Sequence, residues 1–305
     1  MKKVLKVAGV IVLTVIVMVT GLLGFISLRP AAPHHYTRKT NTGGDLEAKY
    51  LSLGPCKTSH LTSEVEGILE KFTIFYPAEL EDSDNIYPAV IMVNGTGIPA
   101  TKYKSVLKHL ASWGFVVVGN EDPSSGSGES TEITLRYLLS ENENDASIFH
   151  HKIDTDNIGL EGHSQGGAGV FSALSITEHK DLYKAAVALS PTQEETAAAL
   201  GWPYELDKIN VPLFMLAGTQ GEFETQMVLP IEAMNTMYDK IPSSKAMARK
   251  VGMEHGQMLY SADGYATAWL LWHLQGDEEA ANIFAGASPE IINNSLYQDQ
   301  KIDLE

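Results

Sequence analysis

The chain has 305 residues and a formal net charge of −16, and 44% of its residues are hydrophobic. The acidic balance argues against nucleic acid or anionic lipid as a partner, and the hydrophobic fraction is enough for a full core. The single cysteine, Cys56, excludes an intrachain disulfide.

The first 29 residues are typical of a membrane-targeting segment. Residues 7–28 form an apolar run without a charge, which follows three lysines and precedes Arg29. The run is long enough to cross a bilayer as a helix and longer than the apolar stretch of most signal peptides. The lysines favour a cytoplasmic N-terminus. We therefore expect a single-pass anchor in the cell membrane with the folded domain outside the cytoplasm; the alternative is secretion after signal cleavage near Ala32.

Residues 30–60 are predicted to form a tether, because the first half is rich in Pro, His, Thr and Gly and shows no apolar period. The remaining residues, 61–305, are long enough for one α/β domain.

Within that domain, predicted strands alternate with predicted helices. This order indicates a mostly parallel sheet with helices on both faces, in which a site forms at the carboxyl ends of the strands. The predicted strands cover residues 68–76, 89–93, 115–118, 157–161, 185–189, 211–218 and 246–252, and the predicted helices 102–113, 131–139, 168–177, 228–238, 264–274 and 278–284.

The sequence Gly162-His163-Ser164-Gln165-Gly166-Gly167 lies between the strand at 157–161 and the helix at 168–177. A Gly-x-Ser-x-Gly pattern in this context indicates a nucleophile elbow, whose tight turn needs small neighbours and leaves the serine Oγ free. A chance Gly-rich turn can show the same pattern, but here both flanks fit. Glu161 inside the elbow strand is expected to be partly buried and therefore paired or hydrogen-bonded.

A serine nucleophile needs a base and an acid; in such folds the acid follows the serine in the chain, and the basic histidine comes last. His255 comes directly after the last predicted strand and is the candidate base. The loop after the strand at 211–218 contains no aspartate, so the acid is Glu222 or Glu224. In an extended loop the two side chains would point to opposite sides, so only one can face the histidine.

An acyl-transfer site also needs two backbone N–H donors for the developing oxyanion. The residue after the nucleophile, Gln165, would supply one, and Thr96, in the loop after the strand at 89–93, the other. His163, Trp202 and Phe223 are candidate walls of the substrate pocket.

These residues give the chain a resemblance to a known family. The segment 68–286 resembles α/β-hydrolases of the dienelactone-hydrolase and cutinase-like group, which includes bacterial polyester hydrolases and relatives of platelet-activating-factor acetylhydrolase. The elbow at 162–167, the strand and loop at 211–222, and His255 followed by the helix at 265–274 carry the likeness.

The resemblance implies Ser164 as nucleophile, His255 as base, Glu222 as acid, and Thr96 and Gln165 as oxyanion hole. The chain departs from the family in three ways: the acid is a glutamate, Thr96 stands where an aromatic residue is common, and disulfides cannot form.

We therefore expect a serine esterase that uses no metal or organic cofactor and acts on small-molecule or polymeric esters. The alternatives are a lipase, phospholipase or peptidase with the same triad, or a catalytically silent cell-surface binding protein.

Overall fold

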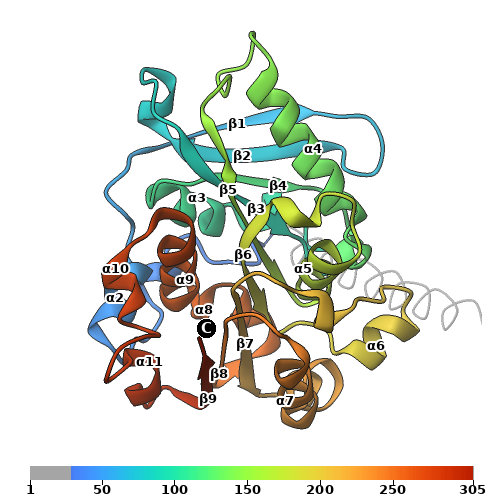
Figure 1. Cartoon of the computed structure of the whole chain (residues 1–305), viewed down its shortest axis with the longest axis vertical. Helices are drawn as coiled ribbons and strands as arrows, with labels where there is room; N and C mark the ends of the chain where they lie inside the picture. The colour runs from blue at the N-terminus through green and yellow to red at the C-terminus, as the bar shows by residue number, and fades with distance from the viewer. Residues whose placement is uncertain (1–28, 305) are drawn as a thin grey trace, which may run out of the picture.

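The computed structural model describes residues 29–304 and contains one nine-stranded sheet (Figure 1). The strand order is β1-β2-β4-β3-β5-β6-β7-β8-β9. The bounds of the strands are β1 Thr58–Glu64, β2 Lys71–Pro77, β3 Tyr87–Val93, β4 Val116–Asn120, β5 Ile153–His163, β6 Tyr183–Leu189, β7 Leu213–Gln220, β8 Lys245–Glu254 and β9 Tyr297–Asp303. The prediction of a mixed α/β domain around a large sheet is confirmed.

The centre of the sheet is parallel and its edges are antiparallel. Strands β3 to β8 pair in parallel, whereas β1, β2 and β9 run against their neighbours. The strand order reverses between β3 and β5, and the carboxyl ends of strands at such a switch point are where α/β sheets bind ligands. The loop after β3 and the elbow after β5 therefore meet at the expected position.

Helices cover both faces of the sheet, and each face has its own hydrophobic core (Figure 1). The central strands are buried on both sides, which explains their almost continuous apolar runs. One face carries α4 (Glu129–Glu143), α5 (Gln165–Ser175), α6 (Glu194–Ala199) and α7 (Ile231–Lys240). The other carries α2 (Asp45–Leu51), α3 (Lys104–Ser112), α8 (Met258–Ser261), α9 (Asp263–Gln275), α10 (Glu278–Ala281) and α11 (Glu290–Asn293).

The prediction of a tether over residues 30–60 is wrong. This segment forms a 3-10 turn at Tyr36–Arg38, helix α2 and the start of β1, and it packs against α9 (blue in Figure 1). Tyr36 and Tyr50 are fully buried, and the Tyr36 hydroxyl donates a hydrogen bond to Asp263 at the start of α9. A few widely spaced aromatic anchors thus hold a segment that is mostly polar.

The predicted anchor, residues 1–29, lies outside the described residues except for Arg29. Among residues 29–304, no helix combines the length and the apolar character that crossing a bilayer requires.

Candidate active site

Ser164 occupies a strained turn between β5 and α5. Its φ of 61° and ψ of −122° are unusual for a residue with a side chain, and strain of this kind is a feature of functional sites. A Cβ at Gly162 would meet the backbone of Gly166, and one at Gly166 would meet the carbonyl of Val93. The two glycines are therefore required by close packing, which keeps Ser164 at the head of α5.

Ser164, His255 and Glu224 form a continuous hydrogen-bonded relay. The Ser164 hydroxyl lies 2.8 Å from His255 Nε2, and His255 Nδ1–H donates to Glu224 Oε2 at 2.6 Å. The histidine comes directly after β8, and the glutamate lies in a π-helical turn, Phe223–Val228, after β7. Three segments distant in sequence thus place a serine hydroxyl, an imidazole and a carboxylate in line, the arrangement that a serine nucleophile requires.

The assignment of Glu222 as the carboxylate beside the histidine is wrong, and the alternative, Glu224, holds this position. Glu222 is exposed, whereas Glu224 is 1% exposed. The extended loop assumed for residues 219–224 does not form, because Gly221, at a φ of 85°, turns the chain into the π-helical turn. That turn directs Glu224 inward and leaves Glu222 in solvent.

The Glu224 carboxylate is held by donors other than the histidine as well. The Ser190 hydroxyl donates to its Oε1 at 2.6 Å and the Gly218 backbone N–H donates to the same atom at 2.7 Å. Burial opposes ionisation of Glu224, but the hydrogen bonds from His255, Ser190 and Gly218 outweigh it and hold the pKa of this carboxyl below its ordinary value. The Glu224 carboxylate is thus an anion whose orientation these hydrogen bonds fix.

Ser190 is a residue of the site that the sequence reasoning missed. It follows β6 directly, at the same edge of the sheet as the other site residues, and it is fully buried with a φ of 42°. Its position after a strand in Ser190-Pro191 was the available signal.

His163 does not line the pocket, contrary to expectation, but packs against the backbone of His255. Its Nε2–H donates to the backbone carbonyl of His255 at 2.8 Å, and the two rings are 4.7 Å apart. Burial and the neighbouring His255 lower the pKa of His163 to about 3, so the ring is neutral and can keep this donor.

A cleft of about 550 Å³ opens above Ser164. Thr96 lines it, as do Trp202 and Phe223. Gln165 is the first residue of α5, so its backbone N–H has no partner inside the helix. The side chain of Phe223 packs edge-on against the His255 ring at 5.0 Å, which shields the relay on its cleft side.

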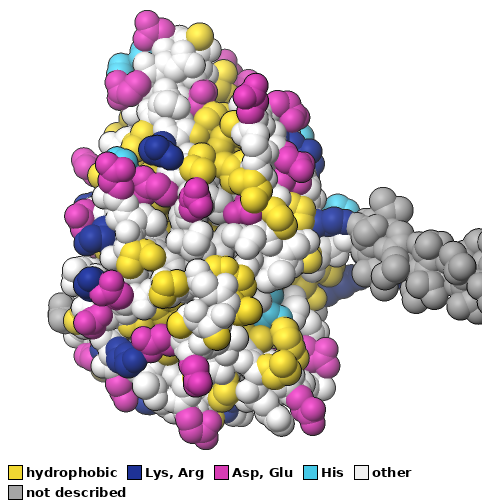
Figure 2. All heavy atoms as spheres, turned by 90° about the vertical axis from the view of Figure 1, so that its right-hand side faces the viewer, with side chains coloured by type: hydrophobic (Ala, Val, Ile, Leu, Met, Phe, Trp, Pro, Cys, Tyr) yellow, Lys and Arg dark blue, Asp and Glu magenta, His cyan; other side chains and the backbone are white. Residues whose placement is uncertain are grey.

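The rim of the cleft is apolar. Leu200, Phe223 and Met227 line the cleft and are each more than half exposed. Figure 2 shows hydrophobic side chains in patches on the face of the molecule that carries α4 to α7. Clustered exposed apolar side chains are typical of a surface that binds a hydrophobic ligand or partner.

Glu161 is buried, but the expectation that it is paired is not met. It is 1% exposed, and both of its carboxylate oxygens lack a hydrogen-bond partner among the described residues. Burial raises the pKa of Glu161 to about 8, so the side chain is mainly protonated at neutral pH.

Among residues 29–304, one group of side chains could hold a metal ion: Glu132, Glu178 and His179, whose ligand atoms lie within 4.8 Å of one another. Glu178 and His179 follow the end of α5 opposite to Ser164, so this group is not part of the relay.

The sequence was compared with known proteins and families. No curated protein matches it. A family model described as PET hydrolase-like matches residues 42–295, which include the whole relay, the cleft residues and eight of the strands in full. The chain therefore belongs to the PET hydrolase-like family, within the cutinase-like polyester hydrolases of the α/β-hydrolase superfamily.

Proposed function

We propose that the chain is a serine esterase that cleaves carboxylic esters with the triad Ser164–His255–Glu224 and through an acyl-enzyme intermediate. The observation that carries the proposal is the relay itself, with 2.8 Å between serine and histidine and 2.6 Å between histidine and glutamate. Membership of the PET hydrolase-like family supports hydrolysis of an ester.

In the first half-reaction, His255 Nε2 takes the Ser164 proton while Oγ attacks the acyl carbon of the ester. The backbone N–H groups of Gln165 and Thr96 stabilise the oxyanion, and Glu224 stabilises the imidazolium. His255 then gives its proton to the departing alkoxide, which leaves as an alcohol. Water loses a proton to His255 as it attacks the acyl-enzyme, and the acid departs as Ser164 recovers its proton.

The cleft supports an ester with a hydrophobic part as substrate. Trp202, Phe223 and Met227 offer an apolar wall beside Ser164, and the rim remains open to solvent. Such a cleft accepts small esters and the end or loop of an ester polymer.

The test is hydrolysis of a panel of p-nitrophenyl esters of increasing chain length, a polyester film and a peptide amide, by the wild type and by Ser164→Ala. We expect ester hydrolysis that the variant loses by several orders of magnitude with its fold intact. Wild-type protein that cleaves only the amide, or Ser164→Ala protein that keeps half of the esterase activity, would contradict the proposal.

We also propose that residues 1–29 anchor the enzyme in the cell membrane. The apolar run at 7–28 supports this. Expression of the full chain, membrane fractionation and N-terminal sequencing test it: an intact N-terminus in the membrane fraction is expected, and a mature end near Ala32 in the medium would refute it.

A further inference from the structure

The segment that carries His255 has weak support from the sheet. Pairing of β8 with β9 ends at Lys250, and pairing with β7 is interrupted beyond the same residue and resumes only at Glu254, opposite Gln220. Gly252 adopts a φ of 75°, and the segment 251–260 then passes through His255 to α8. Regular ladder bonds therefore reach only to Glu254 and do not explain how the part of the segment beyond it, which includes His255, is held.

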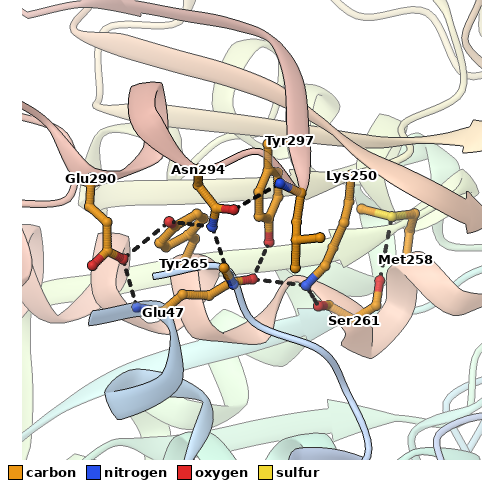
Figure 3. A network of polar contacts seen from close by, with 10 residues as sticks. Glu47, Lys250, Met258, Ser261, Tyr265, Glu290, Asn294 and Tyr297 are labelled. Atoms are coloured by element: carbon orange, nitrogen blue, oxygen red, sulfur yellow. Dashed lines mark hydrogen bonds and ion pairs between the residues drawn. The ribbon is translucent and has the colours of Figure 1, made fainter. Parts of the chain in front are cut away.

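The ammonium group of Lys250 joins the two ends of this segment. Lys250 stands directly before it, and Nζ donates at 2.6 Å to the backbone carbonyl of Ser261, directly after it (Figure 3). The same Nζ forms an ion pair with Glu47 at 2.8 Å. The two charged side chains are 3% and 1% exposed.

Glu47 is fixed by further donors, which come from the other end of the chain and from its own helix start. Its Oε1 also accepts from the Tyr297 hydroxyl at 2.7 Å, and its Oε2 accepts from Asn294 Nδ2 at 2.8 Å (Figure 3). The same Oε2 accepts from the Gly43 N–H at 2.8 Å. A buried charge that is this well compensated has one orientation. It therefore fixes Lys250 as well.

We propose that Lys250 is a positioning residue for the catalytic histidine, His255. Its ammonium group is held by Glu47 of the N-terminal segment and binds the Ser261 carbonyl. These two contacts set the position of the segment 251–260, which presents His255 to Ser164 and Glu224. This proposal depends on the proposed esterase function. Lys250 does not line the cleft, and its ammonium group bonds to Glu47 and to the Ser261 carbonyl, not to a relay residue, so it acts through the segment that it holds.

The test is the double substitution Lys250→Met with Glu47→Gln, because Lys250→Met alone would leave a buried carboxylate without its partner. The amide that Glu47→Gln introduces can still accept from Asn294 and Gly43 and can donate to the Tyr297 hydroxyl. Lys245→Met is the matched control: Lys245 is also buried and lies on β8, but it bonds to the Ile241 carbonyl at the far end of the strand from His255.

In the double variant we expect kcat to fall about tenfold to hundredfold with KM unchanged, since small misplacements of a reacting group have effects of this size. The low-field proton NMR signal of His255 Nδ1–H should move or broaden at a temperature where circular dichroism shows a folded protein. The control should stay within about twofold of wild type with the signal unchanged.

A folded double variant with wild-type kcat and an unchanged NMR signal of His255 Nδ1–H would overturn the proposal that Lys250 positions His255. If the double variant does not fold, Lys250→Gln with Glu47→Gln is used, which also leaves no buried charge unpaired. Faster hydrogen exchange of residues 251–260 than in the control is then expected, and equal exchange would overturn the proposal. A wild-type protein without esterase activity would instead contradict the proposed function. The NMR and hydrogen-exchange measurements test the role of Lys250 without an activity assay.

Discussion

The position of Glu224 leads to a sharp prediction for Glu224→Gln. A glutamine has the same shape, but only one of its two terminal atoms accepts hydrogen bonds. If the amide oxygen keeps the bonds from Ser190 and Gly218, the amide NH₂ faces His255 Nδ1. That nitrogen must then be unprotonated, so the proton moves to Nε2 and the ring can no longer accept the Ser164 proton.

The expected loss follows from this change of tautomer. Replacing the acid of a serine triad by its amide lowers kcat by up to about 10⁴-fold, equivalent to about 5.5 kcal/mol of transition-state stabilisation. We expect Glu224→Gln to lose about 10³-fold to 10⁴-fold in kcat for a p-nitrophenyl ester. The matched control, Glu222→Gln, should remain near wild type because Glu222 is exposed.

The assay is steady-state kinetics of both variants and wild type, with circular dichroism to confirm the fold. A Glu224→Gln enzyme that keeps more than a tenth of wild-type kcat would refute the reasoning. A larger loss in Glu222→Gln would show that the acid is the other glutamate.

Two further predictions concern buried side chains near the relay. Ser190→Ala removes a hydrogen bond to the charged Glu224 and should lower kcat/KM about tenfold. The control Ser175→Ala removes a buried hydroxyl at the far end of α5 and should leave kcat/KM unchanged. Equal effects of the two substitutions in steady-state kinetics would contradict a role of Ser190 in holding Glu224. The pKa of Glu161 is raised from 4.5 to about 8 in the folded protein, so between these pH values the folded protein holds a proton that unfolding releases. The free energy of unfolding should therefore fall as pH rises through this range. Glu161→Gln should flatten this slope by up to ~1.4 kcal/mol per pH unit in urea titrations, and an identical slope in the variant would disprove the buried-acid account.

The elements that could be predicted are those with a local signal. Parallel strands buried on both faces need continuous apolar runs, so β3, β4, β6 and β7 are visible in the sequence. The glycines of the elbow are visible as a Gly-x-Ser-x-Gly pattern that identifies Ser164, although the backbone that Gly166 must avoid is that of the distant Val93.

The features that could not be predicted depend on distant contacts. The edge strands β1 and β9 are largely polar because one side of each faces solvent, so neither shows an apolar run. The segment before β1 is held by isolated anchors such as Tyr36, whose partner Asp263 is 227 positions away. Glu224 depends on a π-helical turn that only the packed structure reveals.

Labelling with a fluorophosphonate probe, followed by peptide mass spectrometry, tests the central claim most directly, because the probe reacts only with a serine activated by its base. We predict one modified site per chain, at Ser164, in wild-type protein, with labelling abolished in Ser164→Ala and strongly slowed in Glu224→Gln. Folded wild-type protein that remains unlabelled, or that is labelled at another serine, would contradict the assignment of Ser164, His255 and Glu224 as the catalytic triad.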